Sequence, residues 1–163
     1  MSLHLYSGLR LSEALNASTT GYGHNTGHRT LTVQRKGGAQ QKVVVPPPAV
    51  EALNAYLQST GQELATAAGE GPSIFTTATG KRWGASEQFR TAQRLTRVAG
   101  IPGQISPHSL PHAYATLALS AGATLHDLQD SMGHADPRST RRYDRAQNSF
   151  MKSTGYEAAR ALA

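Results

Sequence analysis

The stretch RTLTVQRKGGAQQKVVVPP, residues 29–47, decides the fold because it joins two β-forming runs through a glycine-containing connection. The runs cover residues 29–35 and 41–45, and their Val and Thr residues are typical of strands. Gly37 and Gly38 lie between them, and glycine suits tight turns because it adopts positive φ without strain. This arrangement predicts a β-hairpin, whose second strand ends where three consecutive prolines begin.

The remaining apolar residues recur mostly at the three- and four-residue spacing of helices. Val50, Leu53 and Leu57 follow the prolines at this spacing and predict a helix that ends near Gly61. Further helices are expected over residues 9–15 and 86–99 and in three short units after Pro107, of which the second runs from Thr124 to Gly133 and the third is opened by Asp136. The sequence therefore predicts a mainly helical α+β domain with a small antiparallel β-hairpin sheet.

Length and composition suit one folded domain. The chain has 163 residues, of which 38% are hydrophobic and 16% are charged. No apolar run approaches the roughly 20 residues of a membrane span, and the N-terminus has no signal-peptide pattern. Because the chain has no cysteine, disulfides, thiolate zinc sites and cysteine nucleophiles are excluded. These features favour a cytoplasmic protein.

The charge balance favours a polyanionic partner. Lys and Arg number 16 against 10 Asp and Glu, which gives a formal charge of +6. Arginine supplies twelve of the 16 cations, and its planar fork of donors suits phosphate oxygens. We therefore consider nucleic acid first, since no basic amphipathic helix indicates a membrane surface.

Two stretches carry arginines at helical spacing. In the helix expected over residues 86–99, Ser86 is expected as the cap. Phe89, Ala92 and Ala99 are expected to face inward, and Arg90, Arg94 and Arg97 form a stripe. A second stripe contains Arg138, Arg141, Arg142 and Arg145, and on a continuous helix Tyr143 points about 140° away from its centre. Each stripe fits either a solvated face or a surface that contacts phosphates.

General catalytic signatures are absent from the sequence. It has no Walker-type glycine loop, dinucleotide fingerprint, HExxH motif or serine elbow. His108 and His112 are four residues apart, but no acidic or cysteine partner lies at metal spacing, so a zinc site is disfavoured. His4, His24, His28 and His126 are assigned no role. The chemistry of phosphoryl transfer without a metal requires cations, a nucleophile and a general acid, which Arg10, Lys36, His108, His134 and Tyr143 can supply.

Four segments, in order along the chain, resemble the catalytic domain of the tyrosine recombinases, the phage integrase family. They are YSGLRLSEAL (6–15), VQRKGGAQQKVVVPP (33–47), HSLPHAYATLALSAGA (108–123) and MGHADPRSTRRYDRA (132–146). In the last of them a Gly-His pair precedes Tyr143 with the histidine nine residues away. The resemblance covers most of the chain and implies an integrase-type catalytic fold.

The resemblance also implies roles for single residues. Arg10 matches the first catalytic arginine, which binds the scissile phosphate, and Lys36 matches the hairpin lysine, which acts as general acid. His108 and His134 resemble residues that bond the phosphate or assist proton transfer. Tyr143 matches the nucleophile that forms the 3′-phosphotyrosyl link. Because that ester preserves the bond energy, the resemblance implies neither a metal nor any other cofactor.

One position departs from the family pattern. The family's second catalytic arginine would stand at Pro111, and proline offers neither charge nor donor. Losing one preorganised donor costs about 10²–10³ in rate. A proline inside a helix also clashes with the carbonyl four residues earlier, so we expect this helix to start nearer Leu110 and to displace His108. The sequence leaves three explanations of Pro111 open. The natural sequence is degenerate, the proline was introduced on cloning, or another feature of the site compensates for the missing arginine.

The resemblance sets the expected organisation. Residues 1–146 are expected to be the catalytic domain, without the core-binding domain that precedes it in the family, and residues 147–163 a tail or helix that packs on a neighbouring protomer. Expected partners are duplex DNA and further copies in a tetramer on DNA, with neither a membrane nor a small-molecule cofactor. The protein is expected to be prokaryotic or phage-encoded and nucleoid-associated. The alternatives are a degenerate DNA-binding homologue, a type IB topoisomerase and a basic DNA-binding regulator.

Overall fold

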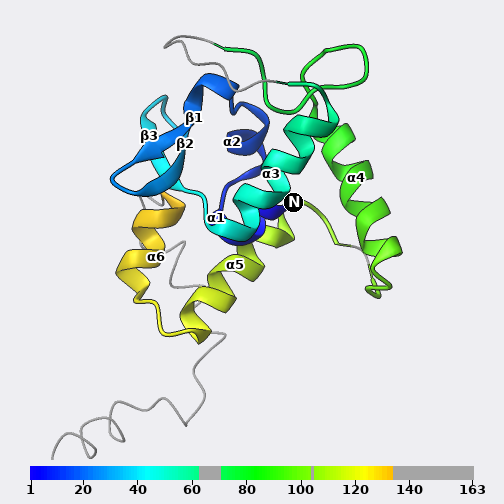
Figure 1. Ribbon diagram of the computed structural model, residues 1–163. Helices are drawn as coiled ribbons and strands as arrows, with labels where there is room; N and C mark the ends of the chain where they lie inside the picture. Colours follow the sequence, from blue (N-terminus) through cyan, green and yellow to red (C-terminus); the bar gives the residue numbers. More distant parts are fainter. Residues whose placement is uncertain (63–70, 104, 134–163) are drawn as a thin grey trace, which may run out of the picture. The chain divides into compact units, whose positions relative to one another are not determined.

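A computed structural model describes residues 1–62, 71–103 and 105–133 (Figure 1). The chain divides into two compact units, residues 1–114 and 115–163. The predicted mixture of helices with a small antiparallel sheet is confirmed. None of the described helices combines the length and the apolar character that crossing a membrane requires.

The first unit contains most of the regular structure. Its elements are α1 (Ser2–Ser7), α2 (Leu11–Leu15), the 3-10 turn η1 (Thr19–Gly21), β1 (Tyr22–Asn25), β2 (His28–Gln34), β3 (Gln40–Val44), α3 (Pro47–Ser59), α4 (Ala85–Val98) and the start of α5 (Ser109–Ser120). The helix expected near residues 9–15, the hairpin and the helix after the prolines are confirmed. The helix α1 and the strand β1 were not predicted, because both are short, at six and four residues, and β1 has Tyr22 as its one apolar residue.

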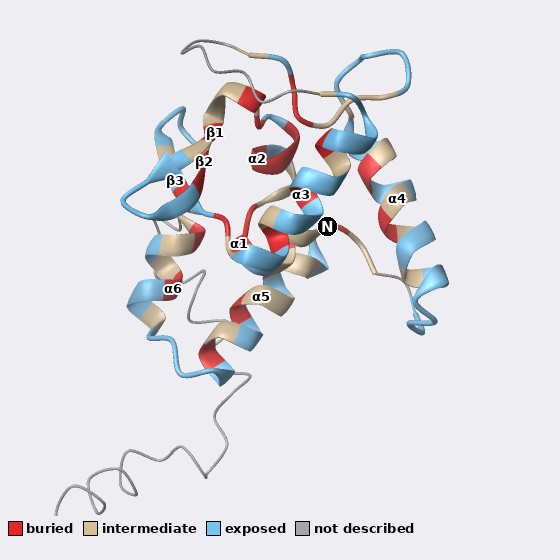
Figure 2. Ribbon diagram, viewed as in Figure 1, coloured by how far each residue is buried: buried red, intermediate tan, exposed pale blue. Residues whose placement is uncertain are grey.

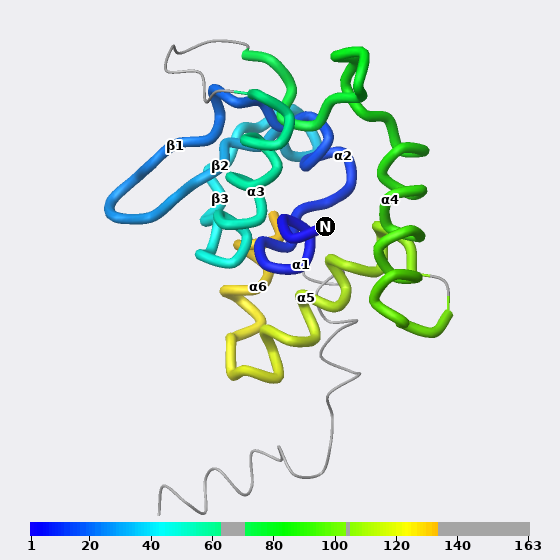
Figure 3. The backbone as a smooth tube through the Cα atoms, turned by 45° about the vertical axis from the view of Figure 1, so that its right-hand side comes forward, coloured from blue at the N-terminus to red at the C-terminus, as the bar shows by residue number. Residues whose placement is uncertain are grey.

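The three strands form an antiparallel sheet in the order β1-β2-β3. In the register, Leu31 of β2 faces Tyr22 of β1 and Val43 of β3, and all three side chains are buried. The turn between β1 and β2 consists of Thr26 and Gly27, both at positive φ (Figure 3). Positive φ at both positions is the conformation that matches the twist of a two-residue hairpin. One face of the sheet thereby enters the core.

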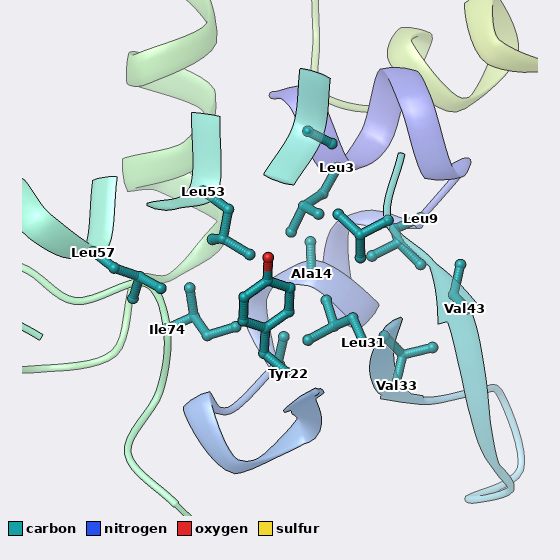
Figure 4. Close-up of a cluster of buried hydrophobic side chains, with 13 residues drawn as sticks. Leu3, Leu9, Ala14, Tyr22, Leu31, Val33, Val43, Leu53, Leu57 and Ile74 are labelled. Carbon is teal, nitrogen blue, oxygen red and sulfur yellow. The ribbon is translucent and has the colours of Figure 1, made fainter. Parts of the chain in front are cut away.

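The core of the first unit joins α1, α2, α3 and the inner face of the sheet (Figure 4). Leu9 and Leu31 are fully buried, as is Ile74 in the long segment that follows α3. The backbone of Ile74 donates to the carbonyl of Ala17 at 3.0 Å, which ties that segment beside the end of α2. Figure 2 shows α2 mostly buried, so the residues at its N-terminus are held by packing from several sides.

Tyr22 carries a buried hydroxyl without a hydrogen-bond partner among the described residues. Its side chain extends into the cluster of Figure 4, and burial raises the pKa of the phenol. A buried unpaired polar group costs about 1–3 kcal/mol. We therefore expect Tyr22→Phe to raise the free energy of unfolding by about 1 kcal/mol in denaturant titrations.

The matched control for this prediction is Tyr56→Phe. The Tyr56 hydroxyl donates to the carbonyl of Thr76 at 3.4 Å and accepts from the Thr76 amide at 3.3 Å. Its removal is expected to lower the free energy of unfolding by about 1 kcal/mol. Equal destabilisation by the two substitutions would contradict the assignment of an unpaired hydroxyl to Tyr22.

The helix α4 differs in detail from its prediction. Gly84, rather than Ser86, is the N-cap residue, and the Glu87 carboxylate accepts from the Gly84 amide at 2.9 Å. Phe89 is 45% exposed and Ala99 is also exposed, so their expected inward orientation is wrong. Only a narrow line through Gln88 and Ala92 is buried on α4. The inward face is set by the few contacts of α4 with the unit, which apolar spacing alone does not reveal.

The second unit is described as far as residue 133. It contains the end of α5 and the helix α6 (Leu125–Met132), whose buried residues are Leu128 and Met132. Thr124, the predicted start, is the N-cap residue and its hydroxyl accepts from the amide of Asp127 at 3.1 Å, and Gly133 ends the helix at a φ of 59°. Both predicted ends of α6 are therefore confirmed. The helix expected from Asp136 and the segment 147–163 lie outside the described residues.

Candidate active site

Arg10 lies at the N-terminus of α2, directly after a sharp change of direction. Gly8, at a φ of 62°, ends α1, and the fully buried Leu9 anchors the connection. The backbone amide of Arg10 donates to Glu13 Oε2 at 2.8 Å, while its Nη1 donates to Glu13 Oε1 at 2.9 Å. The side chain of Arg10 is 35% exposed, whereas that of Glu13 is 2% exposed. A buried carboxylate therefore fixes a guanidinium that reaches the surface.

The same carboxylate holds a second guanidinium. Arg35 Nη1 donates to Glu13 Oε2 at 2.8 Å, and both side chains are buried. We call Arg10, Glu13 and Arg35 the Glu13 cluster. Sequence reasoning missed Glu13 and Arg35, although Glu13 stands three residues after the helix start, the position from which a carboxylate reaches back to the N-cap amide. No sequence signal indicated that Arg35, among polar hairpin residues, would point inward.

Lys36 occupies the turn between β2 and β3, as predicted. The turn is closed by two backbone hydrogen bonds, from Arg35 to the Ala39 carbonyl at 2.7 Å and from Gly38 to the Arg35 carbonyl at 3.0 Å. Gly37 and Gly38 have φ values of 92° and 87°, which only glycine adopts readily. Lys36 is exposed at the tip, where its ammonium group can reach a bound molecule.

His108 lies in the turn before α5 and is exposed. The turn is held by Ser109, whose amide and hydroxyl donate to the Ser106 carbonyl at 3.0 and 2.6 Å. The helix begins at Ser109, which confirms the late start that Pro111 predicted. His108 is therefore placed just outside the helix.

Pro111 is buried in the first turn of α5, as its third residue. The first four amides of a helix have no partner within that helix, so a proline here sacrifices no helical hydrogen bond. The expected steric conflict is avoided by the late start of the helix. The position still supplies no cation and no donor.

A buried histidine, His4, contacts the backbone of the residue that precedes Arg10. His4 is 1% exposed, and its Nδ1 donates to the carbonyl of Leu9 at 2.6 Å. Because this donation places the proton of the neutral ring on Nδ1, the ring Nε2 accepts from the side-chain amide of Gln88. The pKa of His4 is lowered from 6.5 to about 4, mainly by burial. The hydrogen bond to the Leu9 carbonyl and the charge of Glu13 act in the opposite direction, and the charges of the N-terminus and His108 contribute to the lowering. His4, which had been assigned no role, thus fixes the backbone that precedes Arg10.

The lowered pKa of His4 predicts acid sensitivity. The unfolded chain binds a proton at His4 below about pH 6.5, whereas the folded chain resists protonation down to about pH 4. The contribution of the neutral His4 ring to stability is therefore fully present above pH 6.5 and is lost as the pH falls toward 4. The loss lowers the free energy of unfolding by about 3 kcal/mol in total. The measurement is the free energy of unfolding from pH 7.5 to 4, compared with His4→Asn. That variant keeps a donor for the Leu9 carbonyl but does not titrate, and identical pH profiles for the two proteins would disprove the prediction.

The arginines of α4 lie on its exposed side (Figure 2). Arg90 Nη2 pairs with Glu87 Oε1 at 2.8 Å, with side chains 69% and 30% exposed. Such exposed pairs contribute little to stability. Arg94 and Arg97 form no ion pair with another residue in the part of the chain that the structure describes. The stripe is therefore a surface that is available to an anionic partner.

The structure thus brings part of the predicted site together. Arg10 and the turn that carries Lys36 are joined through the Glu13 cluster, whereas His108 lies exposed in the turn before α5. His134, Tyr143, Arg138 and Arg141 lie outside the described residues. Among residues 1–62, 71–103 and 105–133, no group of three or more histidine or acidic side chains could hold a metal ion.

Comparison with known proteins identifies the family of this chain. The model of the phage integrase family matches residues 1–149 of the chain, so the chain belongs to the phage integrase family. Among its curated relatives is the tyrosine recombinase XerD of Mycobacterium leprae, which is 40% identical over 144 residues. The tyrosine recombinase XerC of Rhodospirillum centenum is 35% identical over 136 residues. These alignments cover 85% and 83% of this chain but 45% and 38% of the relatives, so the chain spans less than half of their length.

Solved structures share the fold. The crystal structure of XerA recombinase superposes with a TM-score of 0.76 at 23% identity, covering 96% of this chain and 56% of that chain. XerH site-specific recombinase bound to difH substrate gives a TM-score of 0.75 at 22% identity, covering 97% of this chain and 44% of that chain. The predicted integrase-type catalytic fold is confirmed by this likeness.

Proposed function

We propose that this chain is the catalytic domain of a site-specific DNA recombinase that cleaves and rejoins duplex DNA through a 3′-phosphotyrosyl intermediate. The observation that carries the proposal is the Glu13 cluster, which links Arg10 at 2.9 Å and the root of the Lys36 turn at 2.8 Å to one buried carboxylate. Arg10, held by a buried carboxylate and reaching the surface, together with the exposed Lys36 on the linked turn, suits a phosphodiester. Membership of the phage integrase family supports the same chemistry.

In the proposed reaction, the Tyr143 oxygen attacks the scissile phosphorus and the bond to the 5′-oxygen breaks. The phenolic proton passes to a histidine, for which the sequence offers His108 and His134. Lys36 gives a proton to the departing 5′-oxygen, so that a neutral hydroxyl leaves. Arg10 donates hydrogen bonds to the non-bridging oxygens, where charge grows in the transition state. Attack by a 5′-hydroxyl on the phosphotyrosine reverses these steps and rejoins the strand.

The proposed partner is duplex DNA, bound by an assembly of several copies. Among the structural neighbours, XerH is bound to difH substrate and a lambda integrase dimer is bound to a COC′ core site. For this chain, we assign the phosphate contacts to the arginines of α4 and to Arg138 and Arg141. Residues 147–163 are assigned to packing on a neighbouring protomer in a tetramer. The site of action is the cytoplasm of a prokaryote, at the nucleoid.

The second candidate is an inactive homologue that still binds DNA, and Pro111 favours it. Proline has neither a cation nor a hydrogen-bond donor, so residue 111 supplies none to a bound phosphate. An inactive homologue would keep salt-dependent DNA binding, because that property depends on the exposed arginines rather than on the reacting groups.

Covalent trapping tests the proposed function. The protein is incubated with supercoiled plasmid, denatured and resolved on a gel, with Tyr143→Phe as the matched control. A protein–DNA adduct that is absent with Tyr143→Phe is the expected result, because only the phenolic oxygen forms the ester. An adduct that persists in Tyr143→Phe would overturn the assigned nucleophile. DNA binding without any adduct would instead identify the inactive homologue.

A further inference from the structure

Arg35 is an unexpected buried residue in an exposed turn. Residue 34 and residues 36–40 are all exposed, whereas Arg35 is 7% exposed. It stands directly before Lys36 and is the last residue before the chain reverses. A buried arginine is unfavourable unless it is paired, so its inward orientation needs a structural reason.

The guanidinium of Arg35 joins three segments of the chain. Its Nη1 donates to Glu13 Oε2 on α2 at 2.8 Å, and its Nε donates to Gln41 Oε1 on β3 at 2.8 Å. Its backbone closes the turn through Ala39 and Gly38. One side chain therefore ties both sides of the hairpin to the carboxylate that holds Arg10.

Beyond the two backbone hydrogen bonds that close it, the turn carries two glycines at its tip. Among the described residues, nothing lies within 4 Å of the positions that a Cβ atom would take at Gly37 or Gly38. At these two positions no described residue packs against the tip, and two consecutive glycines give its backbone wide conformational freedom. The direction in which Lys36 points depends on the fixed residue at the base of the turn.

We propose that Arg35 is a positioning residue that couples the Lys36 turn to Arg10 through the shared carboxylate of Glu13. The coupling sets the separation between the cation that binds the phosphate and the lysine that protonates the leaving oxygen. This inference rests on the proposed function for the roles of Arg10 and Lys36. Lysine at position 35 would keep the charge but not the planar fork that serves Glu13 and Gln41 together.

The first test is amide hydrogen exchange in the free protein, which needs no DNA. The variants are Arg35→Met, which keeps the length without the charge, Arg35→Lys and the exposed control Lys42→Met on β3. Arg35→Met is expected to speed exchange at residues 35 and 38 at least about tenfold, while the amides of the β1–β2 pairing change little. Arg35→Lys should restore part of the protection, and Lys42→Met should resemble the parent. Equal acceleration throughout the sheet, or none at the turn, would overturn the proposal.

The second test separates binding from chemistry. Arg35→Met is expected to slow adduct formation on supercoiled plasmid about 10- to 100-fold, because small misplacements of catalytic groups cost that much. Its affinity for the plasmid should equal that of the parent, since the buried guanidinium is not placed to contact phosphates. A parallel loss of affinity and rate, or an unchanged rate, would overturn the coupling. If the parent itself forms no adduct, the proposed function fails, and hydrogen exchange alone decides the role of Arg35.

Discussion

Replacing Pro111 with arginine is expected to raise the rate of adduct formation with supercoiled plasmid by about 10²- to 10³-fold. Position 111 lies in the first turn of α5, three residues after His108, where the family pattern has its second catalytic arginine. An arginine there supplies donors for the developing charge on the phosphate. The backbone amide at position 111 has no partner within the helix, whether the residue is proline or arginine. The substitution is therefore compatible with the start of the helix.

The matched control for this gain is Pro111→Met, which removes the ring without adding a cation. Adduct formation is followed under single-turnover conditions for the parent and both variants, and circular dichroism verifies that each variant is folded. A gain in Pro111→Met equal to that of Pro111→Arg would assign the effect to backbone geometry instead of charge. A parent as fast as Pro111→Arg would mean that another residue compensates for the proline.

The largest expected loss of stability comes from Glu13→Gln. The substitution keeps the shape of the side chain but leaves the buried guanidinium of Arg35 without its counter-charge. Removing one partner of a buried ion pair costs about 3–5 kcal/mol. We expect a loss of that size in the free energy of unfolding, measured by denaturant titration.

The control for Glu13→Gln is Glu87→Gln on α4. Glu87 also pairs with an arginine and caps a helix amide, but its partner Arg90 is 69% exposed. Its loss is expected to lower the free energy of unfolding far less than the loss of Glu13, because solvent screens this exposed pair. If both substitutions cost the same, burial does not strengthen the Glu13 cluster. A double variant, Glu13→Gln with Arg35→Met, should recover part of the loss, because it removes the unpaired charge as well.

Sequence reasoning located the elements whose signals are local. The glycines of the Lys36 turn, the prolines before α3 and the cap Thr124 each act on their own neighbours in the chain, so their effects could be predicted. The strand β1 and the helix α1 carry no comparable signal and form through contacts with other segments. For the same reason Phe89 and Ala99 were wrongly assigned to the inward face of α4, whereas the assignment of Ala92 is confirmed.

In the candidate site, too, the residues in local motifs could be predicted and the contacts between distant segments could not. Arg10 and Lys36 were identified because they lie in short motifs that resemble a known family, and the structure places both at the predicted helix start and turn. Glu13 and Arg35 are 22 positions apart in the sequence, and their contact depends on how α2 packs against the sheet. His4 was dismissed because a single histidine in an apolar context has no readable partner. Its contacts with Leu9 and Gln88 exist only in the folded chain.

The shared carboxylate of Glu13 has an evolutionary consequence. Since two arginines depend on it, the effect of a change at position 13 depends on the residue at position 35, so substitutions at the two positions are epistatic. A lineage that stops cleaving DNA can lose Arg10, whose side chain reaches the surface, long before it loses the buried pair. Retention of Arg10 in a relative therefore reports selection on chemistry, whereas retention of Glu13 reports selection on folding as well as on chemistry.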